Sequence, residues 1–187
     1  ELFNVIPDLC TMGKGLANGH PLSAVMGKRE IMELCSEIFF SGTFGGETLS
    51  LAAAKEVLTL VKSGTVTRKL EDTGSKILEN VRAIVTDNGL DDTFSFSGHP
   101  SWSFVNIHRE TVDDVMLLKT LFIQEMVKRG ILILSSHNIS YAHSSSDVDK
   151  LLAAYSETMG VIKNSVKNNN VLDCLECQPL KLLFRLR

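Results

Sequence analysis

The sequence near the N-terminus reads Pro7-Asp8-Leu9-Cys10-Thr11-Met12-Gly13-Lys14-Gly15-Leu16-Ala17-Asn18-Gly19-His20-Pro21, which sets one lysine among three glycines. Glycine permits tight turns and the close approach of another group, because it has no Cβ atom. Pro21 fixes the backbone angle φ and begins the next element. A lysine that forms an imine with a cofactor aldehyde needs such a setting, whereas an ordinary loop lysine does not. The local pattern alone leaves both interpretations of Lys14 open.

The residues that follow predict a short strand, a short helix and a second glycine-rich loop. The small apolar residues 22–26 favour a buried strand, and residues 28–37 favour a helix. The loop Ser41-Gly42-Thr43-Phe44-Gly45-Gly46 then precedes a helix expected over residues 47–61. Free backbone N–H groups beside the start of a helix are typical of phosphate sites. A plain Ser/Thr cap of the helix is the alternative.

Two blocks of this region resemble the class III aminotransferases, which depend on pyridoxal phosphate (PLP). The first block contains Pro7-Asp8, Gly13-Lys14, Asn18-Gly19 with Pro21, and residues 27–32. The second is Phe40-Ser41-Gly42-Thr43-Phe44-Gly45-Gly46-Glu47-Thr48-Leu49-Ser50-Leu51-Ala52-Ala53-Ala54. Within the class, the chain is most similar to the glutamate-1-semialdehyde 2,1-aminomutase branch and its relatives in surface-polysaccharide gene sets.

The resemblance implies roles for three residues. Lys14 matches the catalytic lysine that binds PLP as a Schiff base. Gly42 and Thr43 match a cofactor-binding position that reaches the PLP phosphate of the other subunit. The resemblance therefore implies a homodimer with a shared active site. The substrate of such an enzyme is expected to be a small amino or keto compound. Its reaction is expected to be that of an aminotransferase or of an aminomutase (an isomerase).

The resemblance also implies an α/β fold, namely the C-terminal part of a PLP-dependent transferase of fold type I. Residues 1–63 are expected to be the end of the large PLP-binding domain, and residues 64–187 a small α+β domain. The chain begins at Glu1 without an initiator methionine. We therefore expect a C-terminal fragment, inactive by itself. The alternative to an enzyme is a non-catalytic fragment that folds or dimerises but does not bind the cofactor.

Periodicity in residues 64–187 predicts three helices and three or four antiparallel strands, with the helices on one side of the sheet. The helices are expected over residues 66–86, over residues 111–128, and after a capping box formed by Ser144 and Asp147. Strands are expected at residues 94–96, 102–107, 131–134 and 139–143.

Composition excludes some other functions. The formal net charge of −3 argues against binding nucleic acid through a basic face. No run approaches the roughly 18 apolar residues of a membrane span, and no signal peptide begins the chain, so a cytoplasmic location is expected.

Cysteine and histidine residues give weaker signals. Cys174 and Cys177 have the Cys-x-x-Cys spacing of zinc or redox sites, but no second ligand pair accompanies them, so no metal is predicted. Two thiols in a loose C-terminal segment are the simpler interpretation. The sequence leaves the roles of His20, His99 and His143 open.

Overall fold

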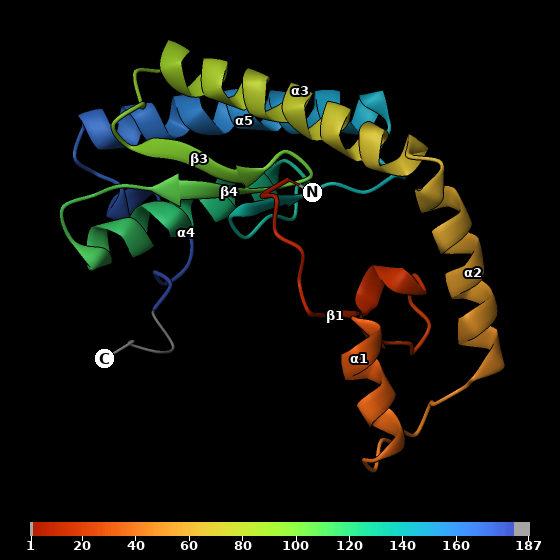
Figure 1. Cartoon of the computed structure of the whole chain (residues 1–187). Coiled ribbons are helices and arrows are strands. Elements are labelled where there is room, and N and C mark those ends of the chain that lie inside the picture. The colour runs from red at the N-terminus through yellow and green to blue at the C-terminus, as the bar shows by residue number, and fades with distance from the viewer. Residues whose placement is uncertain (1, 182–187) are drawn as a thin grey trace. The chain divides into compact units, whose positions relative to one another are not determined.

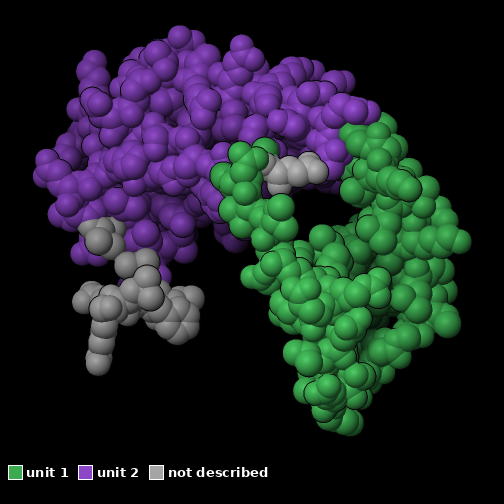
Figure 2. Space-filling model, in the orientation of Figure 1, with its two compact units in different colours: residues 1–66 green, residues 67–187 purple. Residues whose placement is uncertain are grey.

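The computed structural model describes residues 2–181 and contains two compact units (Figure 2). Unit 1 is Glu1–Val66 and unit 2 is Thr67–Arg187. The assignment of residues 1–63 to a larger cofactor-binding domain stays a prediction.

Unit 1 begins with a two-stranded antiparallel hairpin. Strand β1 (Leu9–Met12) pairs with β2 (Ala24–Gly27), so that Leu9 lies opposite Gly27 and Met12 opposite Ala24. A Cβ atom on Gly27 would clash with the Asp8 carbonyl oxygen, which explains the glycine at this end of the hairpin. The expectation of a buried strand was wrong in this chain, since Val25 is 42% exposed. Among the described residues β1 is its only partner strand, so β2 is the edge of a two-stranded sheet rather than a central strand.

The helices of unit 1 follow the predicted pattern. Residues 28–37 form α1 (Arg29–Met32) and the 3₁₀ helix η2 (Glu33–Ser36), and α2 (Thr48–Lys62) covers the region expected to be helical (Figure 1). Gly64 follows α2 with φ +72°, the left-handed conformation that commonly ends a helix.

Unit 1 has almost no hydrophobic core. Among its described residues only Ala17, Ser50 and Ala54 are buried, and all three are small. Large apolar side chains are instead exposed, including Phe39 at 95% and Phe40 at 73%. Because burial of apolar surface is the main stabilising contribution in folding, unit 1 by itself has little to hold it together.

Unit 2 is an α+β unit with a three-stranded antiparallel sheet in the order β3-β4-β5. Figure 1 labels the first two strands of this unit. Its elements, in chain order, are α3 (Thr65–Asp87), β3 (Phe94–His99), β4 (Trp102–Ile107), α4 (Val112–Lys128), β5 (Ser136–Asn138), α5 (Ser145–Lys167) and the 3₁₀ helix η3 (Leu172–Cys174). The three long helices and the first two strands lie where periodicity predicts them. The capping box of α5 is also confirmed, since Ser144 and Asp147 bond each other's backbone.

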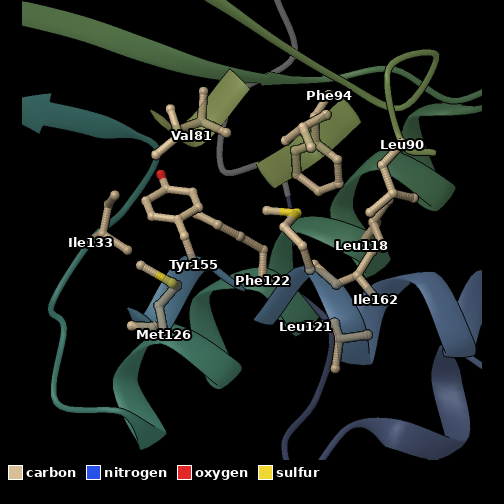
Figure 3. Close-up of a cluster of buried hydrophobic side chains, with 14 of the residues drawn as sticks. Val81, Leu90, Phe94, Leu118, Leu121, Phe122, Met126, Ile133, Tyr155 and Ile162 are labelled. Carbon is tan, nitrogen blue, oxygen red and sulfur yellow. The ribbon is translucent and has the colours of Figure 1, made fainter. Parts of the chain in front are cut away.

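The core of unit 2 lies between one face of the sheet and the three helices. Phe94 and Val105 contribute from the sheet. Val81, Phe122 and Tyr155 contribute from the helices and lie near Phe94 (Figure 3). The rings of Phe94 and Phe122 are 6.1 Å apart, and those of Phe122 and Tyr155 are 5.7 Å apart. All three helices therefore cover the same face, as expected for this α+β arrangement.

The two last predicted strands were wrong. Residues 131–134 form no strand: Ile133 is buried between the exposed Leu132 and Leu134, but these residues pair with no strand in the described chain. The third strand is β5, which is polar and pairs His137 with Ser103 of β4. Residues 139–143 form a turn closed by a bond from the His143 N–H to the Ser140 carbonyl. The described part of the chain therefore contains three strands in this sheet, without the optional fourth.

Among residues 2–181, no helix combines the length and hydropathy of a bilayer span. The same residues contain no cluster of three or more His, Cys, Asp or Glu side chains suited to a metal ion.

Candidate functional site

Lys14 lies in the loop that joins the two strands of the unit 1 hairpin. Strand β1 ends at Met12, Gly13 is extended, and Lys14 opens the 3₁₀ helix η1 (Lys14–Leu16) with φ +50°. A bond of 3.0 Å from the Leu16 N–H to the Gly13 carbonyl closes the bend. A residue with a Cβ atom rarely adopts positive φ, and residues that do so concentrate at functional sites. The backbone therefore distinguishes Lys14 from an ordinary loop lysine.

The side chain of Lys14 is exposed and its amine is available. Within residues 2–181, Lys14 Nζ takes part in no ion pair or hydrogen bond. Lys28, which follows the same hairpin, differs in this respect because its Nζ lies 2.5 Å from Asp8 Oδ1. Of these two lysines beside glycines, Lys14 is the one whose nitrogen has no ion-pair or hydrogen-bond partner among residues 2–181.

The rest of the lysine loop is held by its own backbone. Asn18 has φ +46° and Gly19 has φ +104°, conformations that asparagine and glycine tolerate best. Ala17 between them and Lys14 is fully buried, and its carbonyl accepts a bond from the His20 N–H. Gly15 has no contact that a Cβ atom would disturb, so the expected close approach is not seen there in this chain.

The second loop, residues 41–46, does not cap α2. The cap is Glu47, whose carboxylate accepts bonds from the backbone N–H groups of Leu49 and Ser50 at 2.9 and 2.7 Å. The alternative of a Ser/Thr cap was therefore wrong. In the described part of the chain, the hydroxyls of Ser41 and Thr43 form no hydrogen bond. Both hydroxyls are free to bind a ligand.

Glu47 also determines where an anion can bind. The hydroxyl of Ser50, followed by the N–H groups of Ser50 and Leu49, lowers the pKa of the Glu47 carboxyl, and His20 adds a smaller electrostatic attraction. The negative carboxylate already occupies the N–H groups at the start of α2. A phosphate would therefore have to bind the preceding loop, around Gly42 and Thr43, rather than the helix end itself.

The two loops approach each other at the start of α2. His20, from the lysine loop, is close enough to Glu47 to influence its carboxylate, and η1 contacts α2. No hydrogen bond or ion pair among residues 2–181 joins Lys14 to Gly42 or Thr43. The structure thus places both loops on one unit without bringing these three predicted site residues into direct contact.

The histidines of unit 2 take part in local bonds. His99 Nδ1 lies 2.9 Å from Ser101 Oγ, and His143 Nδ1 accepts a bond of 3.1 Å from the Ser140 N–H. Each stabilises its own turn.

His137 was missed in the sequence, because a short polar segment gives no periodic signal. It is buried, with Nδ1 2.9 Å from Ser103 Oγ and Nε2 2.7 Å from the Tyr155 hydroxyl. Burial lowers the pKa of His137 to about 4, so the ring is neutral at pH 7. Burial also raises the pKa of Tyr155. Both groups are therefore uncharged, and the chain Ser103–His137–Tyr155 joins β4, β5 and α5.

Known proteins resemble this chain over most of its length. It is 33% identical over 172 residues to glutamate-1-semialdehyde 2,1-aminomutase of Methanosarcina acetivorans, covering 85% of this chain and 40% of the relative. It is 25% identical over 166 residues to 3-aminobutyryl-CoA aminotransferase of Cloacimonas acidaminovorans, covering 87% of this chain and 40% of that protein. The chain thus spans about two fifths of the length of these curated relatives.

Solved transaminase structures share the fold. The FumI protein of Sphingopyxis sp. MTA144, in its PLP internal aldimine form, superposes with a TM-score of 0.77 at 23% identity, covering 92% of this chain and 39% of that one. Ornithine aminotransferase of Toxoplasma gondii gives a TM-score of 0.75 at 20% identity, with coverages of 88% and 39%. The family model of aminotransferase class-III matches residues 1–145. This match spans most of the sequence, and the chain therefore belongs to the class-III aminotransferase family.

Proposed function

We propose that this chain carries the cofactor lysine of a PLP-dependent enzyme that transfers amino groups, and that the lysine is Lys14. The observation that supports it most is the state of Lys14: left-handed backbone, exposed side chain and an amine without a partner in the described residues. An unpaired primary amine on a bend is the group that a cofactor aldehyde requires.

The proposed role of Lys14 has two parts. Its Nζ holds the cofactor covalently between reactions, and the same nitrogen, when released and neutral, takes a proton from the substrate carbon and returns it. Bound PLP supplies an electron sink for the bond that is broken. The shape of the lysine loop, held by Ala17 and Asn18, orients Nζ for both tasks.

Gly42 and Thr43 are proposed to bind the cofactor phosphate. The free Thr43 hydroxyl and the backbone N–H groups of a glycine-rich loop are suitable donors for it. In our proposal they serve the second subunit of a homodimer, and the exposed apolar residues 38–40 beside them support an interface at this place.

Amino-group transfer is the reaction class that we propose, on a small amino or keto substrate. The relatives include an aminomutase and an aminotransferase, and one lysine with the same proton-transfer role serves both reactions. Of the two, we favour transamination, because of the resemblance to the polysaccharide-associated branch.

Borohydride trapping tests the assignment. The chain is incubated with PLP, reduced with borohydride and digested, and the cofactor mass is located by peptide sequencing. We expect the label on Lys14 and its loss in Lys14→Ala.

Lys28→Ala is the matched control, because Lys28 follows the same hairpin and also lies beside a glycine but is paired with Asp8. It should keep the label on Lys14. Labelling of Lys28 in the wild type, or equal labelling of many lysines, would contradict the proposal.

The 187 residues alone are expected to retain the cofactor weakly. Unit 1 carries Lys14 but has only three buried residues among those described, so little fixes the loops around a ligand. Dialysis after loading should remove most unreduced PLP. Stoichiometric PLP after dialysis would show that the chain forms a complete site by itself.

A further inference from the structure

The segment that follows α5 lies on α4 and is held there by specific contacts. Val171, Cys174 and Leu175 pack against the core of unit 2. The Leu180 N–H donates a bond of 2.9 Å to Thr120 Oγ1, and Lys128 pairs with Glu176. This end of the described chain is therefore ordered on α4.

The side-chain amide of Gln124 lies at the centre of these contacts. Its Nε2 donates a bond of 3.0 Å to the Cys174 carbonyl, and its Oε1 accepts one of 2.7 Å from the Glu176 N–H. The same oxygen lies 4.0 Å from Cys177 Sγ. One amide thus bonds the backbone on both sides of Leu175, between the two cysteines, and also lies beside the Cys177 sulfur.

The turn fixes the backbone around the two cysteines, and each sulfur has a polar neighbour: Cys174 Sγ lies 4.0 Å from Asn170 Oδ1 and Cys177 Sγ 4.0 Å from Gln124 Oε1. The Cys174 N–H bonds the Val171 carbonyl and the Leu175 N–H bonds the Leu172 carbonyl, after which Leu175 is extended with ψ 134°. Cys177 is exposed and Cys174 is half-buried. An exposed thiol with a second thiol three residues away is the arrangement in which a small disulfide ring closes readily.

We propose that Cys174 and Cys177 form a redox-modification site, which a hydroperoxide oxidises to a reversible intrachain disulfide. Cys177 attacks first because it is exposed: its sulfur bonds the distal peroxide oxygen, the O–O bond breaks, and the alcohol or water leaves. The Cys174 thiol then attacks the sulfenic sulfur of Cys177, the S–S bond forms, and water leaves with the thiol proton.

Two thiols lose two electrons and two protons in total, and the peroxide is reduced. A dithiol reductant reverses the reaction by exchange, forming its own disulfide. The site lies in unit 2 and does not involve Lys14, so it is independent of the proposed amino-group transfer.

Cys10 and Cys35 provide an internal comparison. Cys10 lies in β1 and Cys35 in η2, and neither has a second cysteine nearby in sequence. They should give sulfenic acid or its further oxidation products rather than an intrachain disulfide of this kind.

The test uses the whole chain, folded, with one to a few equivalents of hydrogen peroxide, followed by alkylation and peptide mass spectrometry. We expect the peptide with Cys174 and Cys177 to lose two hydrogens and to recover them with dithiothreitol. In Cys174→Ser, the ring cannot close, and a dimedone-type reagent should trap sulfenic acid on Cys177. Failure to find the intrachain link, or a link from either cysteine to Cys10 or Cys35, would overturn the proposal.

Gln124→Met tests whether the structure of the turn matters. Methionine keeps the length of the side chain and the helix propensity but removes the hydrogen bonds to the turn. We expect ring closure to slow by about tenfold, the factor that loss of one or two neutral hydrogen bonds implies. Gln178→Met, in the same segment, is the control and should close at the wild-type rate. Equal rates in both variants would show that Gln124 does not position the thiols.

Discussion

Lys14 combines an unfavourable backbone conformation with an amine that has no partner among the described residues. An L-residue in the left-handed region costs roughly 1–2 kcal/mol relative to a right-handed conformation, whereas glycine adopts either equally well. A sequence under selection for stability alone would therefore favour glycine here. The lysine side chain at this position therefore comes with a cost in backbone stability.

This cost is measurable in the hairpin. We expect Lys14→Gly to stabilise β1–β2 by roughly 1 kcal/mol relative to Lys14→Ala, because only glycine removes the strain at positive φ. Amide hydrogen exchange of β1 and β2 gives the local free energy. At Lys28, where φ is −58°, the same pair of substitutions should reverse in order. Equal protection in Lys14→Gly and Lys14→Ala would show that Lys14 is not strained.

Thr43 allows a test of the proposed phosphate contact. Thr43→Ala should weaken binding of PLP by about tenfold, the effect of losing one hydrogen bond to a charged group, and leave binding of pyridoxal unchanged, because pyridoxal has no phosphate. Absorbance titrations with both ligands measure this. Ser41→Ala is the control, and a similar loss for both ligands in Thr43→Ala would indicate a general change of the loop.

His137 gives the unit 2 core a defined pH dependence. Its pKa is about 4 in the folded chain against 6.5 for the free side chain, so the unfolded state binds more protons between these values. The contribution of the neutral His137 to the free energy of unfolding is fully present above pH 6.5. The free energy of unfolding then decreases by roughly 3 kcal/mol as the pH falls to 4. Urea unfolding followed by the single tryptophan, Trp102, should show this decrease.

The His137→Asn variant should be less stable at pH 7 and should lose most of the pH dependence in this window. His108→Asn, which removes an exposed partner of Ser95, should keep it. A wild-type curve that is flat between pH 6.5 and 4 would contradict a buried neutral His137.

At the scale of elements, two helical glycines have opposite surroundings. A Cβ atom on Gly74 in α3 would overlap the backbone of Pro100, whereas one on Gly160 in α5 would meet no atom within 4 Å. Alanine normally stabilises a helix by about 1 kcal/mol relative to glycine. We expect that gain in Gly160→Ala and a loss of about 1–3 kcal/mol in Gly74→Ala, where the clash outweighs it. Thermal unfolding of the two variants gives the signs, and stabilisation by Gly74→Ala would show that α3 can move away from Pro100.

The elements that the sequence predicts well are those with long periodic patterns. The stripe on α3 that includes Ile77 and Val81 defines its buried face directly. In β4 the strand itself was predicted but its buried face was not, since Trp102 is 56% exposed and the polar Ser103 is buried. The third strand could not be predicted, because β5 is three polar residues held by pairing with β4 and by the bonds of His137. The apolar residues 131–134 beside it have the stronger strand propensity but only one buried side chain. Tertiary hydrogen bonds therefore determine that β5 is the third strand, whereas the intrinsic strand propensity of residues 131–134 does not.

The candidate site was predictable to a different extent at each loop. The glycines and Asn18 around Lys14 predict a tight turn, although the left-handed conformation of Lys14 itself has no sequence signature. At the second loop, Ser41 and Thr43 look like helix caps, yet Glu47 caps α2 because it directly precedes the helix and its carboxylate bonds the N–H groups of the first turn. The residue types alone do not distinguish a Ser/Thr cap from a Glu47 cap of α2. The hydrogen bonds at the start of the helix do.

For the whole molecule, burial differs sharply between the units, and proteolysis should detect it. Among the described residues, unit 1 buries three small side chains, while unit 2 buries a cluster built around Phe122 and Tyr155. Brief chymotrypsin treatment should cut first within residues 38–44, where the phenylalanines are exposed, and leave a resistant fragment that begins near residue 65. Mass spectrometry identifies the fragment. Cleavage within α4 or α5 at the same rate would contradict a separate stable unit 2.

The same lack of a core in unit 1 has a consequence during protein synthesis. Ribosomes release the chain from the N-terminal end, so unit 1 leaves the exit tunnel before the stable unit 2 exists. Within the described part of unit 1 no residue buries the segment around Phe39 and Phe40, so these residues do not by themselves cover it as it emerges. Such a segment is a natural binding site for chaperones that act on nascent chains, and the yield of native protein should depend on how soon these two phenylalanines are covered.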